Sequence, residues 1–556
     1  MTSRKFARRE ERSILGQGLG WILALGVLYF ILVLPDRLGA LRAVETWWLP
    51  LELPLIVFVL VAAPGVLRAL VRVVIAFSLA VVLLFKIANM AAYFGFARPF
   101  SPLVDALMVP TLLDTLSKAA GKGAAIGALA GVAVIVLLLL TLLAWVTGTV
   151  GSGVHQRNRA GVALVALAVV GLGFTQYASF NASRFVRAQT VMIAQSLRDA
   201  EQFRVQLLEN PFADLPVDQK LAGLKNVDVL LIFVEAYGRA ALDNPAYAPK
   251  LRATLQQFGA ELQEKGFAAR SGWMVSPTFG GESYLAHSTA VSGLLVNDQQ
   301  RYVQLLRSQR RTLVHDFNDA GWRTVAVMPE ITMPWPEADY FTFGKIYTAQ
   351  NLEYKGKSFE YMTMPDQYTL SAFQTRELAP TDRKPVMAEI ALVSSHIPWA
   401  PIPKPVPWEN VGDGSIFTTE RTPETADDVW RTPSRVPEFY ALSIDYTLQT
   451  LKSFVTTYGN ERTLFIIIGD HQPMTFIAGE GAPHDVPVHM IAKDPAILAA
   501  LDEGAWAAGM EPDAASAPWP MDSLRARILQ AFTRVANAPL SAESEAPPQT
   551  APQAKP

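Results

Sequence analysis

Five long apolar segments before residue 180 constrain the fold of this chain more than any other feature. They span approximately residues 15–34, 51–67, 69–85, 124–146 and 160–174. A stretch of about 20 apolar residues matches the hydrocarbon thickness of a bilayer. The mean hydropathy of +0.21 over 556 residues reflects the same excess. Arg68 and Arg72 flank the second and third segments, which predicts a tight hairpin there, and the whole pattern predicts five transmembrane helices.

The distribution of basic residues predicts the orientation of these helices. Short loops on the cytoplasmic side of a membrane are enriched in Lys and Arg. Basic residues cluster at the N-terminus, in the hairpin and before the fifth segment: Arg4, Lys5, Arg8, Arg9, Arg12, Arg68, Arg72, Arg157 and Arg159. No small-residue cleavage site ends the first segment, so it reads as an anchor and not as a signal peptide. An odd number of spans then places everything after residue 180 outside the cytoplasm.

The remainder of the chain divides by composition into three regions. We expect a membrane domain at residues 1–180, followed by an amphipathic linker helix at residues 181–224. We then expect an extracytoplasmic domain at residues 225–540 and a disordered tail at residues 541–556. The chain has no cysteine, which excludes thiol catalysis, zinc–thiolate sites and disulfides. The net charge of −2 gives no sign of nucleic-acid binding.

Strand and helix patterns alternate after Pro216. Apolar runs at 227–234, 323–328, 386–394, 463–468 and 486–492 predict buried strands, and helical patterns lie between them. This alternation predicts an α/β domain with a mostly parallel central sheet and helices on both faces.

Polar residues with metal-binding chemistry follow or flank several of these strands. Glu235 follows the first, His396 the third, and Asp470 and His471 the fourth, while His484 precedes the fifth. Ligands of parallel α/β sheets collect at the carboxyl ends of the strands. Each residue alone also fits a turn, a helix cap or an ordinary loop histidine. Together, carboxylates and imidazoles form a ligand set for zinc or manganese.

A second motif, SPTFGGESYLAHSTAVSGL at 276–294, predicts a nucleophile. Gly280 and Gly281 permit a sharp turn, and Ser283 begins a helical pattern. The N-terminus of a helix favours an anion, and a metal near the serine oxygen would lower the pKa of the hydroxyl. An ordinary helix cap is the alternative reading, and Thr278 is a rival nucleophile.

These motifs, in this order, resemble the alkaline phosphatase/sulfatase superfamily. They are most similar to its membrane-anchored branch, the lipoteichoic acid synthases, phosphoglycerol transferases and phosphoethanolamine transferases. The resemblance implies a multi-pass α-helical membrane domain followed by a sulfatase-like α/β domain. It spans nearly the whole chain and implies the inner membrane of a bacterium, with the catalytic domain on the periplasmic or extracellular side.

The resemblance also implies roles for individual residues. IFVEAYG carries the first metal ligand, Glu235, and GDHQP the pair Asp470 and His471. GGESYLAHSTAVSGL places the nucleophile, itself a metal ligand, at Ser283, where the membrane-bound transferases commonly have threonine. The resemblance implies substrate-binding roles for His396 in SSHIPW, His484 in HDVPVHMIA and Trp335 in MPWPEADYFTFGKIY.

The implied activity is transfer of a phospholipid headgroup, phosphoglycerol or phosphoethanolamine, through a phospho-serine intermediate to an envelope glycan or lipid acceptor. One divalent metal ion, manganese or zinc with magnesium as a further option, is the expected cofactor. Ser283 is not followed by the x-Pro-x-Arg of true sulfatases, which counts against sulfate ester hydrolysis. A hydrolase on the same scaffold and a non-catalytic membrane sensor remain the alternatives.

Overall fold

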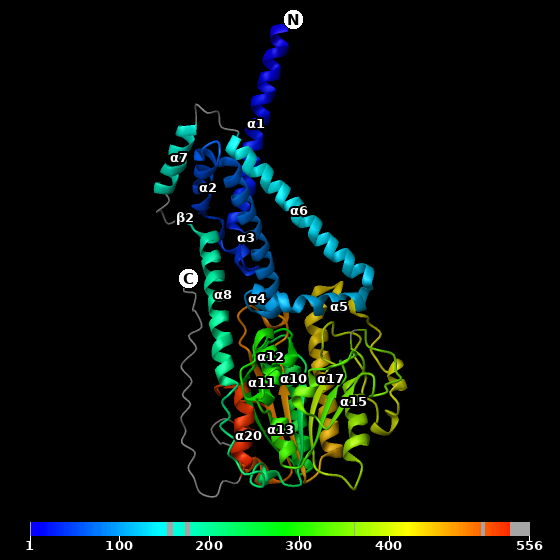
Figure 1. Ribbon diagram of the computed structural model, residues 1–556. Helices are drawn as coiled ribbons and strands as arrows, with labels where there is room; N and C mark the ends of the chain where they lie inside the picture. The colour runs from blue at the N-terminus through cyan, green and yellow to red at the C-terminus, as the bar shows by residue number, and fades with distance from the viewer. Residues whose placement is uncertain (1, 153–158, 173–177, 361, 502–505, 534–556) are drawn as a thin grey trace.

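The computed structural model describes residues 2–152, 159–172, 178–360, 362–501 and 506–533. It consists of a helical part at the N-terminal end and an α/β part below it in Figure 1. Helix α8 (Asn181–Gln206) leaves the helical part and runs alongside toward the α/β part. The predicted linker helix at 181–224 thus begins where expected but ends at Gln206. The predicted disordered tail at 541–556 lies outside the described residues.

All five apolar segments contain helices, but their lengths differ. The helices are α1 (Thr2–Val33), α2 (Glu52–Ala62), α3 (Arg68–Phe96), α6 (Lys122–Ser152) and α7 (Arg159–Leu172). The second and third segments form two separate helices, because α2 ends at Ala62 and α3 starts at Arg68. Among the described residues, two helical stretches, Arg68–Phe96 and Lys122–Gly151, are long and apolar enough to cross a membrane. The five-span membrane domain therefore stays a prediction.

The surface of α6 is strongly apolar. Ile126 is 68% exposed and Leu137 is 62% exposed. Soluble proteins rarely expose apolar surface over a whole helix, so this face is typical of a surface that meets another apolar phase. Two short helices, α4 (Pro102–Asp105) and α5 (Val109–Ala120), lie between the helical part and the α/β part (Figure 1).

A nine-stranded mixed sheet organises the α/β part, with the spatial order β10-β4-β9-β8-β3-β7-β5-β6 and β11 paired with β4. Strands β8, β3, β7, β5 and β6 are mutually parallel, whereas β9 is antiparallel to both β8 and β4. The strands are β3 (Asp228–Val234), β4 (Ala268–Val275), β5 (Arg323–Met328), β6 (Lys345–Thr348), β7 (Val386–Leu392), β8 (Thr463–Gly469), β9 (Asp485–Ala492), β10 (Ala507–Ala508) and β11 (Trp519–Pro520). A separate two-stranded pair joins β1 (Leu49–Pro50) to β2 (Ala178–Ser179).

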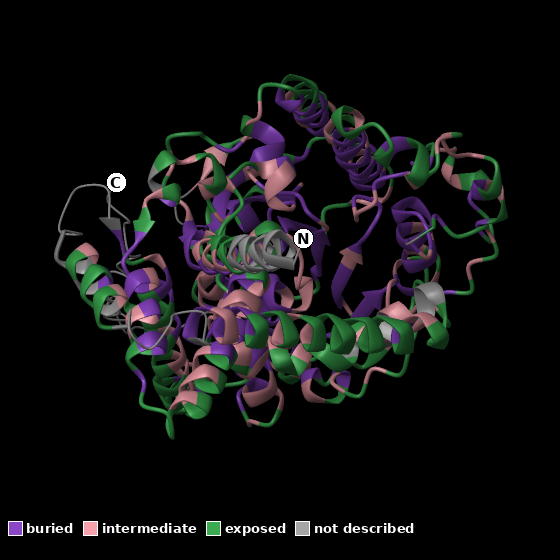
Figure 2. Cartoon of the chain, turned by 90° about the horizontal axis from the view of Figure 1, so that it is seen from above, coloured by how far each residue is buried: buried purple, intermediate pink, exposed green. Residues whose placement is uncertain are grey.

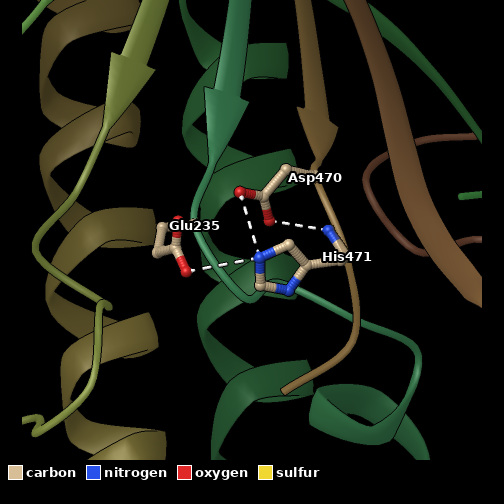
Figure 3. Close-up of side chains that lie close together, drawn as sticks. All are labelled: Glu235, Asp470 and His471. Atoms are coloured by element: carbon tan, nitrogen blue, oxygen red, sulfur yellow. Dashed lines mark hydrogen bonds and ion pairs between the residues drawn. The ribbon is translucent and has the colours of Figure 1, made fainter. Parts of the chain in front are cut away.

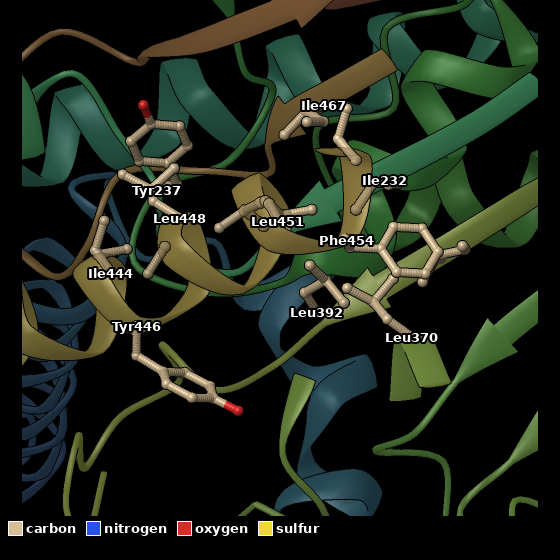
Figure 4. Packing of buried hydrophobic residues seen from close by; sticks show 14 of the residues in the cluster. Ile232, Tyr237, Leu370, Leu392, Ile444, Tyr446, Leu448, Leu451, Phe454 and Ile467 are labelled. Atoms are coloured by element: carbon tan, nitrogen blue, oxygen red, sulfur yellow. The ribbon is translucent and has the colours of Figure 1, made fainter. Parts of the chain in front are cut away.

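Helices cover both faces of this sheet, as the alternation predicted. One face packs against α10 (Ala248–Glu264) and α17 (Val436–Tyr458); Figure 4 shows Leu448, Leu451 and Phe454 of α17 close to strand residues Ile232 and Ile467. The opposite face packs against α11 (Ser283–Ser292), α13 (Leu313–Asp319) and α20 (Leu524–Phe532). Seen from above, the strands are buried and exposed residues gather on the surrounding helices (Figure 2). The other helices of the α/β part are α9 (Ala240–Asp243), α12 (Gln299–Leu306), α14 (Ala338–Phe341), α15 (Asp366–Phe373), α16 (Ala426–Trp430), α18 (Thr475–Ala478) and α19 (Pro495–Ala499).

Candidate active site

The central strands bring the predicted metal ligands together. Strand β3 lies beside β8, and Val234 is the register partner of Gly469. Because the two strands are parallel, the residues that follow them, Glu235 and then Asp470 with His471, emerge at the same edge of the sheet. Strands β3 and β8 are buried along their whole length, so the residues at their ends are held in a rigid part of the sheet.

Glu235, Asp470 and His471 converge on a common point (Figure 3). One ligand atom from each lies within 4.8 Å of the others. Nε2 of His471 is 3.5 Å from Oε1 of Glu235 and 3.7 Å from Oδ2 of Asp470. Two carboxylates and one imidazole within this radius suit a divalent cation of the zinc or manganese type.

Hydrogen bonds orient the ligand atoms toward that point. Nδ1 of His471 donates to the carbonyl oxygen of Gln472 at 2.8 Å, which directs Nε2 toward the cluster. Oδ1 of Asp470 accepts from the backbone N–H of Ala236 at 2.8 Å and from that of His471 at 2.6 Å. Such supporting bonds fix the tautomer and rotamer of metal ligands.

The electrostatics of the cluster also fit a bound cation. Burial raises the pKa of Asp470 to about 7, and the charge of Glu235 acts in the same direction. Burial also acts to raise the pKa of Glu235, but interaction with His471 and His396, together with hydrogen bonds to Asp470 and Ser283, holds that pKa below its usual range. Burial acts to lower the pKa of His471, yet the carboxylates of Asp470 and Glu235 raise it. Two buried carboxylates side by side repel each other, and a divalent cation between them removes that cost.

Ser283 lies against this cluster at the first position of α11. Its Oγ is 3.0 Å from Oε2 of Glu235 and 3.1 Å from Nε2 of His471. Glu282 precedes it with a left-handed backbone (φ 62°), which turns the chain sharply into the helix. The rival Thr278 donates its hydroxyl to the carbonyl of Gly281 within its own turn, so the structure brings Ser283 and not Thr278 to the ligands.

A cavity of about 1070 Å³ opens in front of Ser283. Residues of both the helical part and the α/β part line this cavity. Glu235, Ser283 and Asp470 lie on the α/β side, and apolar side chains of α3 and α5 form the opposite wall, including Ala88, Ala91, Phe96, Val109 and Leu112.

Two of the three predicted substrate-binding residues, His396 and Trp335, line this cavity. His484 is not among its lining residues in the described part of the chain. Its Nδ1 is 3.3 Å from the carbonyl of Ser276, and its ring packs 5.4 Å from that of Phe279. His484 nevertheless lies at the same edge of the sheet, because β9 is antiparallel and begins where β8 ends.

Sequence reasoning missed a histidine–carboxylate pair in the cavity wall. Nδ1 of His287 is 2.9 Å from Oε1 of Glu389, and the imidazole stacks on Phe233 with ring centroids 3.8 Å apart. Two signals pointed to it: His287 is four residues after Ser283, on the same helical face, and Glu389 interrupts an apolar strand. Glu330 also lines the cavity and was missed, because it follows β5 by two residues.

No protein-family model and no curated protein sequence matches the chain. Among solved structures it is similar to the lipoteichoic acid synthase LtaP from Listeria monocytogenes, at 11% identity and TM-score 0.36 over 60% of this chain and 78% of that one. It is similar to the phosphoglycerol transferase GacH from Streptococcus pyogenes, at 13% identity and TM-score 0.36 over 61% and 82%. A Vibrio parahaemolyticus protein of the alkaline phosphatase superfamily matches at 14% identity and TM-score 0.35 over 60% and 74%.

Proposed function

We propose that this chain transfers a phospholipid headgroup, phosphoglycerol or phosphoethanolamine, through Ser283 to a glycan or lipid acceptor at the outer face of a bacterial inner membrane. One observation carries the proposal. The Ser283 hydroxyl lies against three convergent metal-ligand side chains, inside a cavity whose opposite wall is made of apolar residues of α3 and α5. A phospholipid has the matching shape, with a charged phosphodiester and apolar chains.

The side chains have separable roles in this reaction. Ser283 Oγ attacks the phosphorus and loses its proton, the bond to the diacylglycerol oxygen breaks, and that oxygen takes up a proton as diacylglycerol leaves. The headgroup phosphate remains as an ester on the serine. An acceptor hydroxyl then attacks the same phosphorus and releases Ser283. Hydrogen bonding of the serine hydroxyl toward Oε2 of Glu235, at 3.0 Å, orients Oγ before attack.

Glu235, Asp470 and His471 would hold the metal, and Ser283 would complete the set. When bound, the cation would neutralise negative charge that develops on the phosphoryl oxygens. His396 lines the cavity, where its imidazole can bind a non-bridging oxygen or protonate the leaving oxygen. Trp335 lines the same cavity and would pack against the headgroup.

The test uses the full chain in phospholipid vesicles of phosphatidylglycerol or phosphatidylethanolamine. The wild type should release diacylglycerol and pass the headgroup to an added hydroxyl acceptor. Ser283→Ala should lose at least about 10³-fold in turnover, because the nucleophile is removed. Ser292→Ala is the matched control, since Ser292 lies on the same helix but is not among the described residues that line the cavity. Undiminished turnover in Ser283→Ala would refute the nucleophile, and free headgroup phosphate without acceptor modification would indicate hydrolysis.

A further inference from the structure

The last three residues of helix α3 and the two residues after it, together residues 94–98, touch the turn that carries the nucleophile. We name this segment the α3 end, and residues 280–283 the nucleophile turn. A Cβ added to Gly280 would lie 1.9 Å from the carbonyl oxygen of Gly95, closer than any side chain can approach. Gly280 also has φ +72°, so it is glycine for two reasons. The backbones of the α3 end and the nucleophile turn are therefore in direct contact.

An arginine of the α3 end reaches the residue before the nucleophile. Nη2 of Arg98 is 3.4 Å from Oε1 of Glu282 and 2.7 Å from Oδ1 of Asp105. The Glu282 side chain is 4% exposed, so its charge has little access to solvent. Glu282 has a left-handed backbone and directly precedes Ser283, the first residue of α11. The ion pair that holds the Glu282 side chain therefore also holds the orientation of Ser283.

The same α3 end also contacts the start of α18, in the segment that follows the proposed metal ligands. Oγ1 of Thr475 donates to the carbonyl of Phe94 at 2.6 Å, and the Phe94 and Phe476 rings stack with centroids 5.7 Å apart. The nucleophile turn and this segment are joined to each other, since the N–H of Gly280 donates to the carbonyl of Gln472 at 2.9 Å. In Figure 1, α3 descends to the top of the α/β part, beside α4.

We infer that the α3 end is a positioning element of the active site, with Arg98 as its positioning residue acting through Glu282 on Ser283. The inference rests on the proposed role of Ser283. It goes further because it makes the placement of the nucleophile depend on docking of a membrane helix, and not only on the α/β part. A misplacement of about 1 Å in a reacting group can cost 10²-fold in rate.

The first variant is Arg98→Gln in the full chain, assayed with vesicles and with a water-soluble aryl phosphodiester. We expect kcat to fall about 10-fold or more for both substrates, with KM for the soluble one changed less than about 2-fold. Arg98→Lys keeps the charge and should recover part of the loss. Arg204→Gln is the matched control, because Arg204 forms an exposed pair with Glu201 on α8.

The second variant is Gly280→Ala, which pushes the nucleophile turn off the Gly95 carbonyl. Gly266→Ala is its matched control: Gly266 has φ +78°, yet a Cβ there meets no atom within 4 Å. The backbone strain is alike in both variants. A larger loss of kcat in Gly280→Ala than in Gly266→Ala therefore reports the contact with the α3 end. An equal loss of kcat in the two variants would overturn the inference.

Amide hydrogen exchange gives a readout that does not depend on turnover. Arg98→Gln should raise exchange in peptides covering the nucleophile turn and residues 472–476, and Arg204→Gln should leave it unchanged. Unchanged exchange together with unchanged kcat would overturn the inference, as would a rise in KM confined to the lipid substrate, because Arg98 would then bind lipid. If the wild-type chain shows no turnover, the proposed function is wrong. Amide hydrogen exchange would then still test whether the α3 end holds the nucleophile turn in place.

Discussion

Acidification should destabilise the α/β part through one buried histidine, His489. This residue lies in β9 and is 0% exposed. Its Nδ1 is 2.8 Å from the Ser271 hydroxyl and its Nε2 is 3.3 Å from the Tyr237 hydroxyl, so both ring nitrogens face neutral groups. Burial lowers the pKa of His489 to about 3. Its ordinary pKa of about 6.5 applies in the unfolded chain.

The sign follows from this difference. The unfolded state takes up the proton first as the pH falls, so stability is fully present above about pH 6.5 and is lost as the pH falls toward about 3. Over the 1.5 pH units from about 6.5 to pH 5, the loss is about 2 kcal/mol, since each unit is worth about 1.4 kcal/mol. A loss of that size lowers Tm by a few degrees in a domain of about 250 residues.

Tryptophan fluorescence during heating measures this effect in detergent, because the chain has 12 tryptophans. The Tm difference between pH 8 and pH 5 should be smaller in His489→Gln than in the wild type, since glutamine cannot take up the proton. Other groups titrate in both proteins and cancel in the comparison. An equal pH dependence in the two proteins would refute the reasoning.

Three further predictions concern the metal, the nucleophile and a buried ion pair. His471→Ala should lose the bound divalent ion, measured by elemental mass spectrometry, while His484→Ala should retain it; an ion kept in His471→Ala would contradict the ligand set. Ser283→Thr keeps a hydroxyl and should hold turnover within about 10-fold of wild type, measured by diacylglycerol release, whereas complete inactivity would argue against a simple hydroxyl nucleophile. Asp316→Ala leaves the buried Arg525, whose Nε is 2.8 Å from Asp316, without its partner. It should cost about 3–5 kcal/mol of stability in the same fluorescence assay, and an unchanged Tm would contradict this.

The sequence predicted the strands that form the centre of the sheet, because continuous apolar runs such as 463–468 are typical of strands buried on both faces. It missed β4, because Arg270, Ser271 and Gly272 interrupt its apolar pattern. Strand β6 and the two-residue strands β10 and β11 are too short for any periodicity to appear. The antiparallel direction of β9 depends on the connection, which apolar pattern alone does not reveal.

The convergence of Glu235, Asp470 and His471 was predictable because these residues directly follow strand ends, where topology alone brings them together. The His287–Glu389 pair was not, since it joins a helix to the middle of a strand and depends on how they pack. Contact between the α3 end and the nucleophile turn was also hidden, because Gly95 and Gly280 are far apart in sequence and carry no side chain.

Mass spectrometry of the protein trapped during turnover tests the central claim most directly. After rapid quenching with phospholipid vesicles, the peptide that contains Ser283 should gain the mass of the headgroup phosphate on that residue, and the added mass identifies the headgroup. Ser283→Ala should show no adduct. An adduct on Thr278, or turnover with no covalent adduct in the wild type, would contradict the account.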